Sequence, residues 1–350
     1  MRVAAGFAPW RVVCAAMVMA MASSFAWPQA VVAEIPDEVF PESDLLSGKR
    51  TSRSECEATR HAVWVVHKEG EACIRYFPSS NVDGAKTAAF FFHGDVLEGR
   101  FVIKGAYRNN KASVLLKTSE DLARVNAMPY ILVARPGVFG SSGSHLERRR
   151  LEEYLALNAA VDAIKAKHGI KQVHLGGQSG GATSVGALLT LGRSDVVCAA
   201  ASSGGFNALG RAQDMARQRS LNWNGCDAHG VCGPYNVTDH VAGILASPTR
   251  RIFLVGDPQD SNTAFRYQQE FADKIAAANH KVAMLTADAR GPQHHSLAHM
   301  ANRVLGWCNA GYDTDRIAAL ARSNALALRA PPPKPKSSAS SAQPPTDETP

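Results

Sequence analysis

The pentapeptide Gly-Gln-Ser-Gly-Gly at residues 177–181 constrains the fold more than any other feature of this chain. An apolar run at 172–175 precedes it, and a run of small and apolar residues at 182–189 follows it. These flanks predict a strand, a sharp turn and a helix, with Ser179 held on the turn in a strained backbone conformation. Glycines two residues before and after the serine leave space where a Cβ atom would clash. Because the pattern also arises by chance, its meaning depends on the residues around it.

Short apolar runs alternate with helical patterns, which is typical of a mostly parallel sheet covered by helices on both faces. We expect an opening hairpin from 62–66 and 74–77. Further strands are expected at 87–92, 130–134, 172–175, 196–201, 252–255 and 282–285. Helices are expected at 149–168, 182–189, 264–278, 297–307 and 316–329. The alternation stops between 203 and 250, and we interpret that stretch as an inserted cap on an α/β domain.

The two ends of the 350-residue chain differ in composition from its middle. The first residues are basic, then apolar from Val12, then small before Glu34, which predicts a secretory signal peptide over 1–33. The alternative is an uncleaved membrane anchor, although the apolar run is short for a span. Residues 331–350 are proline-rich and predict a disordered tail. We therefore expect one domain over 34–330, periplasmic or secreted, with no stable membrane span after cleavage.

Six of the seven cysteines follow the predicted signal peptide, which contains Cys14. An even number of cysteines in an exported protein indicates disulfides. Sequence leaves the connectivity open, and the pairs that we favour are Cys56–Cys73, Cys226–Cys232 and Cys198–Cys308.

Other chemistries find little support in the sequence. A metal site of Cys226, His229 and Cys232 is conceivable, but their spacing matches no zinc pattern. The glycines fit neither the dinucleotide-binding nor the phosphate-loop spacing, so no cofactor is expected. The net charge of +7 is too small to indicate nucleic acid, and the expected partner is a small-molecule or peptide substrate.

An acid and a base follow Ser179 along the chain, each in a loop after a later predicted strand, in the order expected for this type of sheet. A serine hydroxyl becomes nucleophilic when an imidazole takes its proton and a carboxylate orients that imidazole. The loop after the 252–255 strand contains Asp257 and Asp260, of which we favour Asp260 as the acid. The loop after the last strand contains His294 and His295, of which we favour His295 as the base. Asp257 and His294 remain the alternatives.

Two backbone N–H groups are expected to stabilise the oxyanion that forms during acyl transfer. One is that of Gly180, at the start of the helix after the nucleophile, where the helix dipole helps. The other is that of Asp95, in the loop after the 87–92 strand. A carboxylate beside a developing anion is unfavourable, so we expect the Asp95 side chain to point away or to meet Arg135 or Arg100.

The chain resembles the α/β-hydrolase superfamily over roughly residues 60–310. The residues that carry the resemblance are His93-Gly94-Asp95, 135–143, 177–181, 256–260 and His294-His295. Ser-Gly-Gly at 179–181 and the Gly-Asp-Pro-Gln-Asp loop are also similar to the catalytic domain of prolyl-oligopeptidase-like peptidases. The segment before residue 60 is too short for the propeller of that family, so this likeness does not imply peptidase activity.

The resemblance implies a serine hydrolase that acts on an ester or related acyl bond. A serine peptidase with the same three residues is the alternative, because acyl chemistry is shared and only the pocket distinguishes the two. A third hypothesis is a catalytically inactive binding protein on the same fold.

Overall fold

The computed structural model describes residues 37–107 and 110–329. The predicted signal peptide over 1–33 and the proline-rich tail over 331–350 lie outside these ranges.

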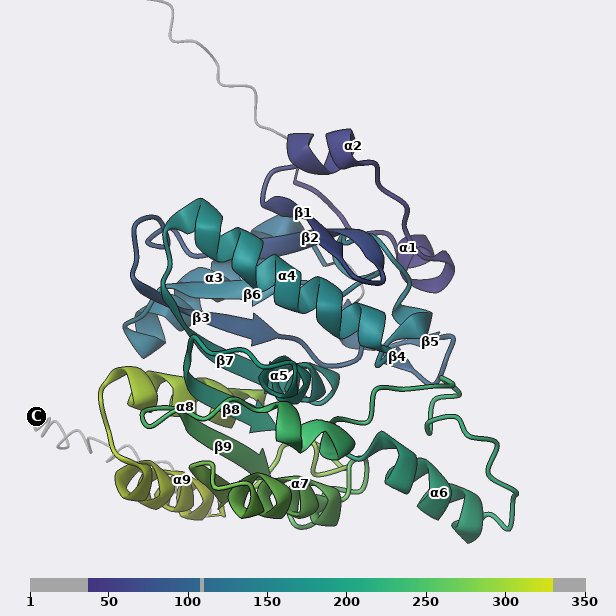
Figure 1. Ribbon diagram of the computed structural model, residues 1–350, viewed down its shortest axis with the longest axis vertical. Coiled ribbons are helices and arrows are strands. Elements are labelled where there is room, and N and C mark those ends of the chain that lie inside the picture. Colours follow the sequence, from purple (N-terminus) through teal and green to yellow (C-terminus); the bar gives the residue numbers. More distant parts are fainter. Residues whose placement is uncertain (1–36, 108–109, 330–350) are drawn as a thin grey trace, which may run out of the picture. The chain divides into compact units, whose positions relative to one another are not determined.

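A single eight-stranded sheet runs through the described residues (Figure 1). Its strands are β1 (Ala62–His67), β2 (Gly70–Pro78), β3 (Thr87–Phe92), β6 (Tyr130–Val133), β7 (Gln172–Gln178), β8 (Val196–Ser202), β9 (Arg251–Gly256) and β10 (Val282–Thr286). The order across the sheet is β1-β2-β6-β3-β7-β8-β9-β10. β2 pairs antiparallel with β1 and β6, and all other neighbours pair parallel. The predicted opening hairpin and mostly parallel sheet are confirmed.

Helices cover both faces of this sheet (Figure 1). The helices of the described residues are α1 (Glu42–Ser47), α2 (Arg53–Ala58), α3 (Ala112–Asn126), α4 (Leu151–His168), α5 (Gly180–Thr190), α6 (Ala208–Gln218), α7 (Phe265–Ala277), α8 (Ala298–Asn309) and α9 (Thr314–Arg329). α4, α5 and α7 pack on one face of the sheet, and α3, α8 and α9 pack on the other. The five helices expected from the sequence are all present.

The strands explain why the core has two layers, because successive side chains of a strand point to opposite faces. In β9, Ile252 and Leu254 belong to the cluster beneath α4, α5 and α7, whereas Phe253 and Val255 belong to the cluster beneath α3 and α8. All four side chains are almost fully buried. Burying a large apolar side chain contributes about 1.5–3 kcal/mol, so both layers stabilise the strands whose carboxyl ends lead into the loops at 257–264 and 287–297.

The described residues contain three disulfides, with the pairing that the sequence favours. Cys56–Cys73 joins α2 to β2, Cys198–Cys308 joins β8 to α8, and Cys226–Cys232 closes a short loop. The last bridge engages both sulfurs of the conceivable metal site, so those cysteines are not available as thiolate ligands.

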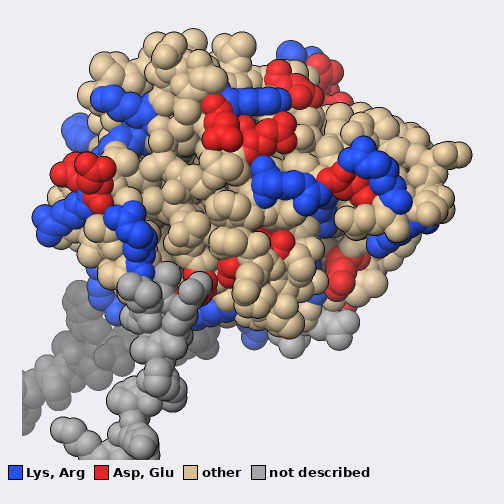
Figure 2. Space-filling view, turned by 90° about the horizontal axis from the view of Figure 1, so that it is seen from below, with Lys and Arg blue, Asp and Glu red and all other residues tan. Residues whose placement is uncertain are grey.

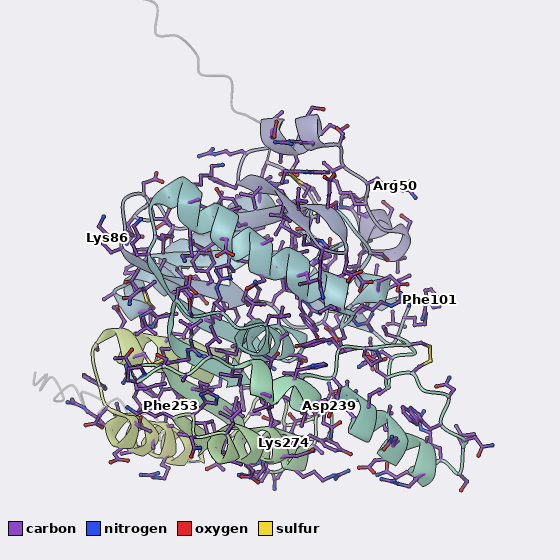
Figure 3. The ribbon with its side chains drawn as sticks, in the orientation of Figure 1. Arg50, Lys86, Phe101, Asp239, Phe253 and Lys274 are labelled. Atoms are coloured by element: carbon purple, nitrogen blue, oxygen red, sulfur yellow. A yellow bond between two sulfur atoms is a disulfide. The ribbon has the colours of Figure 1, made fainter. Side chains whose placement is uncertain are left out.

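Several elements of the described residues have no counterpart among the sequence predictions. They include the short helices α1 and α2, the longer helices α3 and α6, and a small hairpin of β4 (Leu97–Glu98) and β5 (Val102–Ile103). α6 lies within 203–250, together with the 3-10 helix η3 (Val237–Gly243). The side chain of Phe101, at the hairpin turn, points outward and is 68% exposed (Figure 3).

Candidate active site

Ser179 occupies the turn between β7 and α5 with a backbone that few residues other than glycine adopt. Its φ is 56° and its ψ is −120°. A Cβ atom on Gly177 would lie 2.3 Å from the Gly181 carbonyl oxygen, and one on Gly181 would lie 2.0 Å from that of Phe92. Glycine is therefore required at both positions, and the strained turn presents Ser179 at the carboxyl end of the parallel strands.

The structure brings Ser179, His295 and Asp260 into one hydrogen-bonded chain. His295 Nε2 lies 2.9 Å from Ser179 Oγ, and His295 Nδ1 lies 2.9 Å from Asp260 Oδ2. The Asp260 side chain is fully buried and that of His295 is 14% exposed. Thr263 Oγ1 and the N–H groups of Asn262 and Thr263 lie within hydrogen-bonding distance of the Asp260 carboxylate. This geometry allows the imidazole to take a proton from the serine while the carboxylate fixes its orientation.

Asp257 and His294, the alternative acid and base, form a second pair that does not reach the serine. His294 Nδ1 lies 3.3 Å from Asp257 Oδ2, and its side chain is 43% exposed. Asp257 also accepts hydrogen bonds from the N–H groups of Gln259 and Ala289. The structure thus places the favoured pair, and not the alternative one, at Ser179.

Gln178, which the sequence analysis did not single out, connects the loop of His294 and His295 to the turn at Ser179 through hydrogen bonds. Its side-chain amide donates to the carbonyl oxygen of His295 at 2.7 Å, and its Oε1 accepts from the N–H of Leu297 at 3.0 Å. Ser202 Oγ donates to the same Oε1. A variable position within Gly-x-Ser-x-Gly gives no signal of this role, because His295 and Leu297 lie more than a hundred residues later.

The two expected oxyanion donors lie beside Ser179: the N–H of Asp95 is in the loop after β3, and that of Gly180 is at the first residue of α5. Gly94 packs so closely that a Cβ on it would be 3.3 Å from Ser179 Cβ. Among the described residues, neither N–H has a protein acceptor. His93 Nε2 accepts from the N–H of Arg135, so its Nδ1 carries the proton that bonds to the Gly94 carbonyl and holds the loop. Burial lowers the pKa of His93 to about 3, which keeps this ring neutral.

The Asp95 carboxylate is neutralised by a cluster of arginines and does not point away from the site. Its oxygens pair with Arg135 at 2.7 Å, with Arg148 at 3.3 Å, and with Arg149. Burial alone would raise the pKa of Asp95, but the charges of these three arginines hold it well below its usual value. The expected pairing with Arg135 is present, whereas Arg100 instead donates to the carbonyl oxygen of Gly230.

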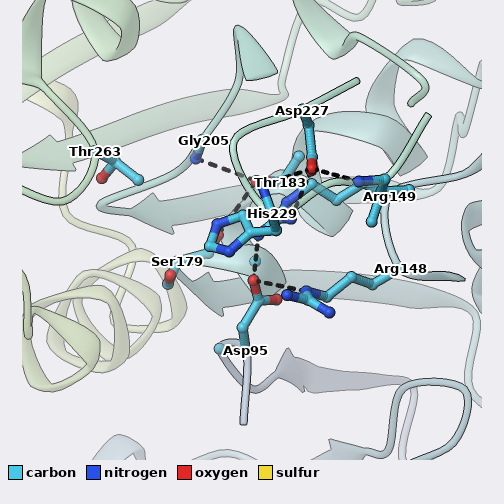
Figure 4. A network of polar contacts seen from close by, with 12 residues as sticks. Asp95, Arg148, Arg149, Ser179, Thr183, Gly205, Asp227, His229 and Thr263 are labelled. Atoms are coloured by element: carbon cyan, nitrogen blue, oxygen red, sulfur yellow. Dashed lines mark hydrogen bonds and ion pairs between the residues drawn. The ribbon is translucent and has the colours of Figure 1, made fainter. Parts of the chain in front are cut away.

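A small pocket of about 30 Å³ opens at Ser179. Figure 4 shows Ser179 and His229 at this pocket, together with the Asp227–Arg149 ion pair. The complete lining is Asp95, Lys104, Arg149, Ser179, Gly180, Thr183, Gly205, Ala208, Arg211, Asp227, Ala228, His229, Asn262 and Thr263. Asp227 to His229 come from the loop that Cys226–Cys232 closes. The sequence indicated that disulfide, but nothing in it showed that the loop reaches the nucleophile.

No group of histidines, cysteines and carboxylates in the described part of the chain has the arrangement of a metal site. None of the helices within the described ranges has the length and apolar character needed to cross a membrane.

The strand order, the helices on both faces and the serine turn after a central strand define the architecture. The fold is that of the α/β-hydrolases. The chain matches no family model and no curated protein.

Solved structures of similar fold include esterases and a peptidase. Est1E from Butyrivibrio proteoclasticus, with ferulic acid bound, is 13% identical with a TM-score of 0.49, over 71% of this chain and 98% of that one. The esterase Pf2001 from Pyrococcus furiosus is 15% identical with a TM-score of 0.46, over 69% and 86% of the two chains. The acylaminoacyl peptidase of Pyrococcus horikoshii is 13% identical with a TM-score of 0.47, over 73% of this chain and 43% of the peptidase.

Proposed function

We propose that the protein is an exported serine hydrolase that cleaves an ester or related acyl bond through an acyl-enzyme. The observation that carries the proposal is the position of His295, within 2.9 Å of both Ser179 Oγ and Asp260 Oδ2. The free N–H groups of Asp95 and Gly180 beside Ser179 support it, because they provide donors for a developing oxyanion.

In the first half of the reaction, Ser179 Oγ forms a bond to the substrate carbonyl carbon and passes its proton to His295 Nε2. The negative charge that develops on the carbonyl oxygen is stabilised by the two backbone N–H groups. The bond to the leaving group then breaks, and His295 gives its proton to the departing oxygen. In the second half, His295 takes a proton from water, the hydroxide attacks the acyl carbon, and Ser179 recovers its proton as the acid leaves.

Two further assignments belong to this proposal. The segment 203–250 acts as the cap over the active site, which is supported by the pocket residues Asp227 to His229. Export to the periplasm or the medium is supported by the three disulfides, because such bonds persist in oxidising compartments.

A fluorophosphonate probe tests the nucleophile, because it reacts covalently with an activated serine. We expect the wild-type protein to be labelled and Ser179→Ala to lose all labelling. Ser184→Ala is the matched control, since this serine lies one helical turn further along α5 and bonds to the Gly180 carbonyl oxygen. A wild-type protein that resists labelling would favour a binding protein on this fold over an enzyme.

The bond that is cleaved is tested separately, by comparing short-chain nitrophenyl esters with peptide amides. We expect efficient ester turnover that depends on acyl chain length. Efficient amide cleavage with little preference among esters would contradict the ester assignment and favour the serine peptidase.

A further inference from the structure

Two cations, Lys104 and Arg211, line the Ser179 pocket without forming an ion pair. Lys104 directly follows the β4–β5 hairpin, and Arg211 lies in the first turns of α6. Within the described ranges, neither side chain forms a salt bridge with a carboxylate. Arg211 contacts only neutral groups, with its guanidinium 3.2 Å from His229 Nε2 and 3.0 Å from Asn262 Oδ1.

The two carboxylates that line the pocket are already engaged by other arginines. Asp95 pairs with Arg135, Arg148 and Arg149. Asp227 pairs with Arg149 at 2.8 Å and accepts hydrogen bonds from two backbone N–H groups. These carboxylates therefore act on Lys104 and Arg211 only at longer range, and the pocket wall keeps an excess of positive charge.

Lys104 and Arg211 are half-buried, and taking a charge even partly out of water is costly unless a partner compensates it. Burial is the main cause that lowers the pKa of both Lys104 and Arg211. The face of the molecule in Figure 2 shows basic and acidic groups interspersed among uncharged residues, with neither sign covering it. The cationic wall beside Ser179, formed by Lys104 and Arg211, provides donors for an anion that enters with the substrate.

The space directly beside Ser179 is narrow, about 30 Å³, and is partly open to solvent. A carboxylate on a short chain is small enough to enter it. Arginine can bind a carboxylate through two parallel N–H donors, and the ammonium group of a lysine can add a further donor.

We propose that Lys104 and Arg211 bind a carboxylate of the substrate, so that the preferred substrates are short esters with a carboxylate close to the scissile acyl group. This inference rests on the proposed function of Ser179 and names the substrate class of that site.

The test compares monoethyl succinate with ethyl butyrate, which has a similar acyl length but no charge. Acid release by the full-length protein is followed by titration at constant pH. We expect kcat/KM to be about 10- to 100-fold higher for monoethyl succinate, as for a charge-assisted hydrogen bond, and the preference to shrink in 0.5 M salt. A second pair, acetoxyacetate and ethyl acetate, shows whether a carboxylate on the leaving-group side is preferred instead.

Variants assign the preference to the two cations. Arg211→Gln and Lys104→Gln should each lower the ratio of kcat/KM for monoethyl succinate to that for ethyl butyrate about 10-fold. Arg217→Gln is the matched control, because Arg217 lies on the same helix with a 72% exposed side chain that pairs with Asp214. It should keep the full preference. Thermal melts of all three variants verify folding, and two separate cation variants guard against the failure of either one to fold.

The outcomes separate this inference from the proposed function. Fluorophosphonate labelling of Ser179 together with equal turnover of anionic and neutral esters would overturn the inference and leave the function standing. A preference that persists in both cation variants would also overturn it. Absence of labelling and of any turnover would overturn the proposed function, and with it the inference.

Discussion

Two aspartate–histidine pairs lie side by side on the loops after β9 and β10, and their surroundings differ. Asp260 and His295 are 2.9 Å apart, the carboxylate is fully buried, and the imidazole extends to Ser179. Asp257 and His294 are 3.3 Å apart, and the imidazole is 43% exposed and contacts no serine. The two aspartates are three positions apart in one loop, and the two histidines are adjacent in the other. They form two pairs, and only one of these pairs faces Ser179.

The difference lies in what anchors each pair. The His295 loop is bonded to Gln178, directly before the nucleophile, so its imidazole is fixed relative to Ser179. Asp257 instead accepts from the N–H groups of Gln259 and Ala289 and thereby joins the two loops to each other. We infer that the first pair performs the chemistry and that the second supports the loops. Reaction geometry depends on such anchoring, because small misplacements of catalytic groups are costly.

The largest expected effect separates the two histidines. His295→Ala should lower kcat by about 10⁴- to 10⁶-fold, because Ser179 loses the group that takes its proton. His294→Ala should stay within about 3-fold of the wild type, since its side chain is partly exposed and does not contact Ser179. The measurement is ester turnover at saturating substrate. Equal losses in both variants would contradict the division of roles.

The next largest effect distinguishes the two aspartates, one by its effect on kcat and the other by its effect on stability. Asp260→Asn should lower kcat by about 10³- to 10⁴-fold, because an amide does not stabilise the imidazolium or select the correct tautomer. Asp257→Asn should leave kcat nearly unchanged but lower the free energy of unfolding by about 1 kcal/mol, since it weakens the bonds between the loops. Turnover and urea unfolding of both variants measure the two scales. If Asp257→Asn lowered kcat without a change in stability, Asp257 and not Asp260 would be the catalytic acid.

Much of the fold could be predicted because its strands are short, uniformly apolar runs. Ala88, Phe90 and Phe92 face one layer of the core while Ala89 and Phe91 face the other, and such a strand is recognisable without knowing its neighbours. α3 was missed for the opposite reason. Its buried face includes Ser119 and Asn126, and these polar residues interrupt the apolar periodicity of the helix. Ser119 is accommodated by a hydrogen bond to the Phe77 carbonyl oxygen, which no local pattern reveals.

The candidate site likewise has a part that could be predicted from the sequence and a part that could not. Ser179, Asp260 and His295 could be proposed because each follows a recognisable strand, and parallel strands bring their carboxyl ends to one edge of the sheet. The pocket wall could not be proposed, because Arg211 and His229 belong to the irregular segment 203–250. Their position depends on packing and on the Cys226–Cys232 loop, and neither follows from local sequence.

The smallest expected effect tests the anchor that distinguishes the two pairs. Gln178→Met keeps the length of the side chain but removes its bonds to the His295 carbonyl and the Leu297 N–H. The imidazole would then be less firmly positioned, and kcat should fall about 10-fold while labelling of Ser179 by a fluorophosphonate slows by a similar factor. Gln259→Met is the matched control, because this exposed glutamine lies in the aspartate loop, where only its backbone N–H bonds to Asp257. An unchanged kcat in Gln178→Met would mean that the loop after β10 positions His295 without the hydrogen bonds to Gln178. These bonds would then not explain why only one of the two pairs reaches Ser179.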